Sequence, residues 1–154
     1  MRRSVSASPS SVWPARALVV LRVCLGVFLI VKSSSKFGWV LDSSPLTARL
    51  TKWMAKEDAV EVSRWYAQFL LPGAPIFARL SLIGELGGGI ALIVGFHTRL
   101  IAALAALMIL NYHLATGGLI NFEFLSDASG LVVVSALITL ALGGGGLPLS
   151  VTRP

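Results

Sequence analysis

The chain has 154 residues, of which 55% are hydrophobic and only 13% are charged, compared with about 25% charged residues in soluble domains. A soluble protein of this size must expose a large share of its residues to water, so the composition indicates an integral membrane protein of one domain. The net charge of +6 is dispersed and has no aromatic-basic stacking platform, which argues against nucleic acid as a partner, and the lone cysteine, Cys24, excludes disulfide frameworks and cysteine-based metal clusters.

Residues 1–16 are predicted to form a polar N-terminal tail, followed by a first membrane helix from Ala17 to about Leu41. Arg22 lies near the start of this helix, and Lys32 and Lys36 lie near its far end, where long cationic side chains can reach the polar edge of the bilayer. A signal peptide is the competing interpretation of this region. No small-residue cleavage site follows the apolar run, so we expect the helix to be retained.

Residues 42–77 break the apolar pattern, and we expect two short amphipathic helices that lie on the membrane surface. Ser44 is predicted to be the N-cap of the first of these two surface helices, because proline follows it at the first helical position. Asp58 and Glu61 have the spacing of a capping box for the second helix. Aromatic residues on the apolar faces are candidate membrane anchors or a docking face for a partner: Trp53, Trp65 and Tyr66.

Three further apolar runs lie at about residues 77–96, 100–115 and 128–142. None of them alone contains the ~18 consecutive uncharged residues that would identify a membrane helix by itself. Together with the first run, and with turn residues between them, they predict an all-α fold. We expect an integral membrane four-helix bundle over residues 17–150, followed by a C-terminal tail at residues 151–154.

Glu85 stands inside the second of these four runs, at a position that is expected to lie within the bilayer. A carboxylate at that depth costs about 2.5–3.5 kcal/mol unless it faces the protein interior and finds a partner. Glycines after it let a neighbouring helix approach closely and are candidate packing residues: Gly87, Gly88 and Gly89. The run ends in a tight turn that is marked by Gly95, Thr98 and Arg99.

We predict that both termini face the cytoplasm, because the segments on that side contain arginines and no acidic residue: Arg2, Arg3, Arg16, Arg99 and Arg153. The turn at residues 116–127 carries only the acidic Glu123 and Asp127 as charges and is expected to face outward. The segment 42–77 and its flanks contain seven basic residues on the outer side, which argues for the opposite orientation. The short turns are the better guide, because surface helices have their own reasons to carry charge.

Helix rise places Glu85 roughly 10 Å below the outer end of the second membrane helix, at nearly the depth of Lys32. Arg22 lies lower on the first helix, from where its long side chain could approach Glu85. We predict that one of these two basic residues pairs with Glu85. Either Asn111 or His113, in the outer half of the third helix, is expected to complete a buried polar network.

A structural role for this network is favoured over a catalytic one, since ion pairs that hold a fold together also perturb carboxylates. His113 is expected to form hydrogen bonds near a helix end rather than to bind a metal or haem, because no second ligand stands at helical spacing. No nucleophile–base pair, metal signature or phosphate-binding loop is evident. The residues alone therefore identify no catalytic set and no metal site.

The order and spacing of several motifs resemble the DoxX family. The first helix contains the pattern Arg22-x-x-x-Gly26-x-Phe28, with Lys36 after it, and Glu85 is followed by Leu-Gly-Gly-Gly. Further matching features lie along residues 18–150: the stretch Gly95-Phe-His-Thr-Arg99-Leu-Ile-Ala-Ala, Asn111, Asp127 and the glycine-rich end before Leu149-Ser150. The family is similar in fold to the small subunit of thiosulfate:quinone oxidoreductase, a four-helix membrane protein, and the resemblance implies a membrane subunit linked to redox partners.

Two functions are compatible with this resemblance. The first is a multi-pass accessory subunit of the bacterial inner membrane, which packs against other subunits of a respiratory or photosynthetic electron-transfer complex and has no chemistry of its own. The second is a quinone-linked oxidoreductase subunit that uses Glu85 as a proton acceptor beside a quinone head group. A quinone, a pigment or a lipid at the bundle surface is the candidate cofactor. A transporter is disfavoured, because no broken-helix repeat is visible.

Overall fold

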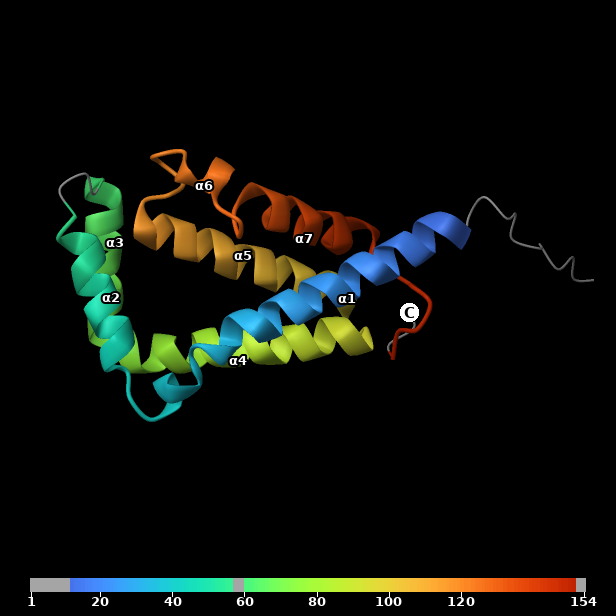
Figure 1. Cartoon of the computed structure of the whole chain (residues 1–154), viewed down its shortest axis with the longest axis horizontal. Helices are drawn as coiled ribbons and strands as arrows, with labels where there is room; N and C mark the ends of the chain where they lie inside the picture. The colour runs from blue at the N-terminus through green and yellow to red at the C-terminus, as the bar shows by residue number, and fades with distance from the viewer. Residues whose placement is uncertain (1–11, 57–59, 152–154) are drawn as a thin grey trace, which may run out of the picture.

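The computed structural model describes residues 12–56 and 60–151, and this part of the chain contains helices and no strand (Figure 1). In chain order the elements are α1 (Val12–Ser34), η2 (Phe37–Val40), α2 (Ser44–Met54), α3 (Glu61–Leu70), η3 (Leu71–Gly73), α4 (Ala74–Val94), α5 (Thr98–Thr116), α6 (Glu123–Ser126) and α7 (Leu131–Gly143). The predicted all-α fold is confirmed for these residues. Residues 1–11 of the predicted tail, with Arg2 and Arg3, lie outside the described residues, as do Asp58 and Arg153.

Three helical segments of the described chain are long and apolar enough to cross a membrane: Trp13–Ser34, Glu61–Val94 and Thr98–Thr116. The last long helix, α7, is apolar but has only 13 residues. Its length corresponds to about 20 Å, against a hydrocarbon core of about 30 Å. The chain is therefore a membrane protein with three candidate spans, and a fourth crossing through α7 stays a prediction.

The four longest helices run lengthwise through the molecule, with α1 packed on α4 and α5 packed on α7 (Figure 1). Their buried side chains form one apolar core: Leu25, Leu29, Leu92, Ala102, Ala105, Ala106, Ile109, Val134, Leu137 and Leu140. Small alanines on α5 allow it to approach its neighbours on two sides.

Glycines bring the backbones of α1 and α4 into contact. A Cβ atom built on Gly89 would lie 2.7 Å from the carbonyl oxygen of Gly26, and the reverse contact is also 2.7 Å. Gly88 makes only ordinary side-chain contacts, and a Cβ on Gly87 would meet open space. Of the three glycines that we considered for packing, Gly89 is the one at the helix crossing, and its partner Gly26 lies on α1.

Helices α2 and α3 lie across one end of the long helices (Figure 1). A second apolar cluster holds them there: Leu50, Ala67, Leu70, Ala74 and Ala115. The η3 turn contains Pro72 and joins α3 to α4 without an intervening loop, so the chain bends sharply between the two helices. A membrane-surface location for α2 and α3 stays a prediction.

The first helix is shifted toward the N-terminus relative to its predicted range of 17–41. It begins at Val12 and ends at Ser34, so the predicted end at Leu41 is wrong. The hydroxyl groups of Ser33, Ser34 and Ser35 each donate to the carbonyl three residues earlier, at 2.7, 2.7 and 3.3 Å. Such local hydrogen bonds compete with the helix backbone, and here the chain leaves the helix and turns into η2.

The start of α2 also differs from its prediction. Ser44 is the first helical residue and the assigned N-cap is Ser43, so Ser44 is not the cap. The carboxylate of Asp42 accepts hydrogen bonds from the backbone nitrogen of Ser44 at 2.8 Å and from its hydroxyl group at 2.6 Å. Asp42 therefore satisfies a donor that would otherwise be free at this helix start. The second predicted cap, Asp58, lies outside the described residues, and α3 follows Val60.

The turn between α4 and α5 requires the glycine that the sequence places there. Gly95 has φ = +74°, and the backbone nitrogens of Gly95 and Phe96 donate to the carbonyls of Leu92 and Ala91 at 3.1 and 2.8 Å. This pattern closes a helix C-terminus and reverses the chain. Arg99, one residue inside α5, donates from Nε to the carbonyl of Ala141 at 3.0 Å and joins α5 to the end of α7.

Candidate functional site

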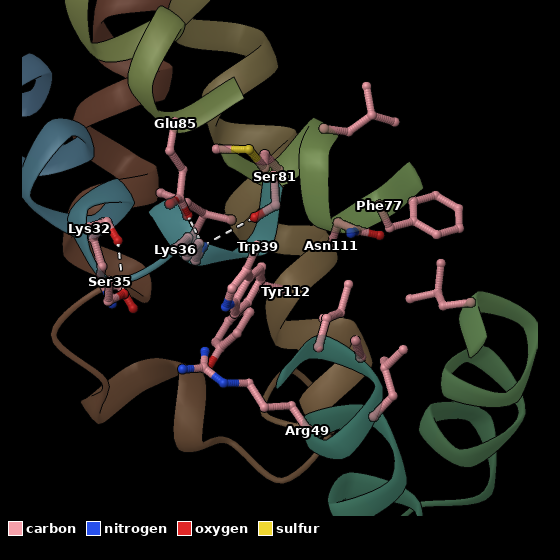
Figure 2. A pocket seen from close by; sticks show the side chains of 18 of the residues that line it. Lys32, Ser35, Lys36, Trp39, Arg49, Phe77, Ser81, Glu85, Asn111 and Tyr112 are labelled. Carbon is pink, nitrogen blue, oxygen red and sulfur yellow. Dashed lines mark hydrogen bonds and ion pairs between the residues drawn. The ribbon is translucent and has the colours of Figure 1, made fainter. Parts of the chain in front are cut away.

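A buried ion pair joins the chain after α1 to the middle of α4. The ammonium group of Lys36 contacts Oε1 of Glu85 and donates to Oγ of Ser81 at 3.1 Å (Figure 2). Ser81 and Glu85 are four residues apart and therefore lie on the same face of α4. The prediction that Glu85 finds a basic partner is right, but the partner is Lys36.

The two basic residues that we predicted as partners of Glu85 lie elsewhere, so both of these predictions are wrong. Lys32 is exposed, and its ammonium group lies 5.8 Å from the centre of the Phe28 ring. Arg22 is 1% exposed and donates to Oγ of Ser150 at 2.7 Å and to the carbonyl of Leu149 at 3.0 Å. Arg22 thus binds the C-terminal segment against α1, at the end of the molecule opposite α2 and α3.

The two polar residues expected to complete the network form separate groups. Asn111 is exposed and accepts a hydrogen bond from the hydroxyl group of Tyr66. His113 is buried, and its Nε2 lies 3.8 Å from Oδ1 of Asp127. Neither residue has a described hydrogen bond to Glu85. The residues of the predicted single network therefore lie in separate places: the Lys36–Glu85 pair, the Tyr66–Asn111 pair, the His113–Asp127 pair, the contact of Arg22 with Leu149 and Ser150, and Lys32 over the ring of Phe28.

The loop before α7 is organised around Asp127. Its Oδ1 accepts from the hydroxyl group of Ser129 at 2.5 Å and from the backbone nitrogen of Ser129 at 2.6 Å. The side-chain hydrogen bond from Ser129 is the main cause that lowers the pKa of Asp127 below its ordinary value, and the nearby His113 and Lys32 act in the same direction. Ser129 also lines the cavity described next, so this loop forms part of its wall.

A cavity of about 280 Å³ lies beside the Lys36–Glu85 pair, between the end of α1, η2, α2, α4 and α5 (Figure 2). Figure 2 shows Arg49 on the side opposite Glu85, beside the rings of Trp39 and Tyr112. The ring of Trp39 has two cations near it, with Nζ of Lys36 5.4 Å and Cζ of Arg49 5.0 Å from its centre. Much of the remaining lining is apolar: Phe28, Leu29, Leu46, Leu50, Leu70, Phe77, Leu80, Met108 and Ile109.

The polar groups of this cavity are only partly satisfied by the protein. Oε2 of Glu85 is buried and has no hydrogen-bond partner within residues 12–56 and 60–151. Arg49 forms no ion pair with any described residue, and its guanidinium group has donors to offer from the wall opposite Glu85. The arrangement is an apolar cavity with donors on two walls, an aromatic ring between them and one free carboxylate oxygen.

The three aromatic residues predicted as anchors or docking residues have different surroundings. Trp53 lines the cavity and packs edge-on against Tyr112, with ring centres 5.5 Å apart. Tyr66 binds Asn111 through its hydroxyl group. Trp65 is 64% exposed and stacks on Phe69 with ring centres 6.1 Å apart. Only Trp65 therefore presents its ring outward, and its use as an anchor or docking residue stays a prediction.

Several residues of the cavity were missed from the sequence. The sequence predicts Lys36 and Trp39 near the end of the first membrane helix, and it gives Lys36 no partner. Arg49 had a readable signal, because it shares a helix face with Leu46 and Trp53 at spacings of three and four. Among the described residues, no group of three or more His, Cys, Asp or Glu side chains is placed to hold a metal ion.

The sequence was compared with known proteins. The family model described as DoxX matches residues 17–117, a range that runs from the early part of α1 to the end of α5. The match includes both polar walls of the cavity, with Lys36, Arg49, Glu85 and Tyr112. No curated protein and no solved structure matches the sequence.

Proposed function

Since the chain belongs to the DoxX family, we propose that it is a membrane subunit that holds a quinone head group in the cavity between α1, α2, α4 and α5. The observation that carries this proposal is the position of donors on two walls of an apolar cavity, Lys36 on one and Arg49 with Tyr112 on the other. A larger electron-transfer complex supplies the redox partner.

The chemistry of a quinone suits these walls. A benzoquinone has a flat ring with carbonyl oxygens on opposite sides, and each oxygen accepts hydrogen bonds. The ring of Trp39 lines the space between the walls, with the cations of Lys36 and Arg49 over it. The volume of about 280 Å³ is just below the range of ligand pockets, which occupy about 300–1,000 Å³. It accommodates a head group, and the apolar tail of the quinone then lies along the lipid-facing helices.

Glu85 has a chemical role in this proposal. Oxidation of a quinol to a quinone releases two electrons and two protons. Glu85 accepts one proton from one hydroxyl group, and the other proton passes from the second hydroxyl group to water at the wall of the exposed Arg49. The ammonium group of Lys36 contacts Oε1, so Oε2 is the oxygen that receives the proton. The electrons pass to an electron-accepting partner subunit.

Intrinsic fluorescence tests quinone binding directly. The chain has four tryptophans, of which Trp39 and Trp53 line the cavity, whereas Trp13 and Trp65 are exposed elsewhere. Titration of the detergent-solubilised protein with decylubiquinone should quench fluorescence with saturation. The variant W13F/W65F should retain the saturable phase and W39F/W53F should lose it. Quenching that rises linearly and equally in both variants would contradict the proposal.

A second candidate function is the packing subunit without chemistry. One face of α4 favours it: Ile83, Ile90 and Val94 are exposed there, and Gly87 between them has open space above its Cα atom. A helix of a neighbouring subunit could approach closely at Gly87. Replacement of Gly87 by leucine should then release the protein from its native complex in blue-native electrophoresis. An unchanged complex would argue against this contact.

The same proposal includes a location and an orientation. We place the protein in the bacterial inner membrane, with both termini in the cytoplasm and with α2 and α3 on the outer face. Supporting this, Arg16 and Arg99 stand at the end of the bundle remote from α2 and α3, in agreement with the positive-inside rule. Lys52→Cys in a C24A background should react with a membrane-impermeant maleimide in cells whose inner membrane is intact. Labelling only after membrane lysis would reverse the orientation.

A further inference from the structure

The carboxylate of Glu85 has one oxygen that the protein does not use. Oε1 is bound by Lys36, whereas Oε2 is buried and has no hydrogen-bond partner among the described residues. An ionised carboxylate can only accept hydrogen bonds, so Oε2 requires a donor. Leaving a buried charged acceptor unmet is unfavourable. Glu85 lines the cavity, so a rotation of its carboxylate that brings the covered Oε2 to the cavity surface lets a bound molecule supply this donor.

Lys36 adds a second requirement at the same wall. Its ammonium group has three protons, and two of them are directed to Glu85 and Ser81. The third is not engaged in any described hydrogen bond. This wall therefore presents a free acceptor and a free donor next to each other. A hydroxyl group satisfies both, because it donates one hydrogen bond and accepts another, whereas a carbonyl group only accepts.

The opposite wall does not make this distinction. Arg49 and Tyr112 can each donate to an oxygen atom, and the oxygen of a carbonyl or of a hydroxyl group accepts from either of them. Because the hydroxyl group of Tyr112 can donate or accept, this wall serves either form, and the two forms differ mainly at the wall of Glu85 and Lys36.

We propose that the cavity binds the reduced, hydroxyl-bearing quinol in preference to the quinone, with one hydroxyl group donating to Oε2 of Glu85 and accepting from Lys36. This inference rests on the proposed function, since it assigns the redox form of the ligand at the same site. A quinone placed there would set its carbonyl oxygen against Oε2 and leave that oxygen without a donor.

Equilibrium dialysis of the wild-type protein tests the preference without any variant. Decylubiquinol and decylubiquinone are compared anaerobically in the same detergent, so that partition into micelles is measured for both. We expect the quinol to bind about tenfold more tightly, the difference that one hydrogen bond to a charged group makes. Equal affinities would overturn this inference and leave the proposed function intact. Saturable binding of neither form would overturn both.

A pair of matched variants assigns the preference to Glu85. The amide of E85Q offers an N–H donor that a quinone carbonyl can accept, so the preference for the quinol should fall to about one or reverse. E123Q makes the same change at an exposed residue of α6 outside the cavity and should keep the wild-type ratio. Y112F should weaken both forms alike. A wild-type ratio retained in E85Q would overturn the assignment.

Discussion

Replacement of Lys36 by methionine tests the pairing around which the cavity is built. The side chains of Lys36 and Glu85 are only 11% and 12% exposed, so K36M leaves a carboxylate with little access to water and without its cation. Removal of one partner of a buried ion pair costs about 3–5 kcal/mol, and we expect K36M to lower the free energy of unfolding by an amount in this range. Titration of the detergent-solubilised protein with SDS, followed by circular dichroism, measures the change.

K32M is the matched control, because Lys32 lines the same cavity four residues earlier but is exposed. Its loss should cost less than about 1 kcal/mol. The double variant K36M/E85L removes both charges and should recover most of the stability, because apolar residues often replace a buried pair without loss. Equal losses in K36M and K32M, or no recovery in the double variant, would refute a stabilising pair between Lys36 and Glu85.

Three further outcomes are expected. Gly89→Ala should cost about 1–3 kcal/mol, because its Cβ would lie 2.7 Å from a carbonyl oxygen of α1, whereas Gly87→Ala meets open space and should be neutral or stabilising in thermal unfolding. Arg22→Met should release the C-terminal segment, measured as faster amide hydrogen exchange there. The side-chain hydrogen bond from Ser129 lowers the pKa of Asp127, so this carboxylate stabilises the fold fully above its unfolded pKa of about 3.9, and the contribution is lost as pH falls through the folded pKa. Ser129→Ala raises that folded pKa and should move the loss to higher pH in unfolding curves recorded across the acid range.

The class of the protein could be predicted because it depends on composition and on local signals. Apolar runs separated by turn residues are enough to predict membrane helices, and the reversal at Gly95 needs only a residue that tolerates positive φ. The apolar runs do not determine how many of these helices cross the bilayer. The last helix has 13 residues in the structure, so its apolar character alone does not decide whether it spans.

The partner of Glu85 could not be predicted, because it depends on where α1 ends. Depth was estimated as if the helix continued to Leu41, and a continuous helix places Lys32 at the level of Glu85. The chain instead leaves the helix after Ser34, and the backbone nitrogen of Lys36 donates to the carbonyl of Ser33 at 2.9 Å in the turn that follows. Helix propensity changes little at these serines, so competition from their side chains decides the boundary.

The early end of α1 also explains why the cavity exists. A helix that continued would carry Lys36 and Trp39 away from α4 along its own axis. Because the chain turns back through η2, Lys36 reaches Glu85 and Trp39 is buried next to it, with Arg49 of α2 against the same ring. The turn after α1, helix α2 and the middle of α4 thus meet at this place. The ion pair holds this turn in place, and the turn forms one wall of the cavity. A substitution that separates Lys36 from Glu85 should therefore reduce both stability and quinone binding.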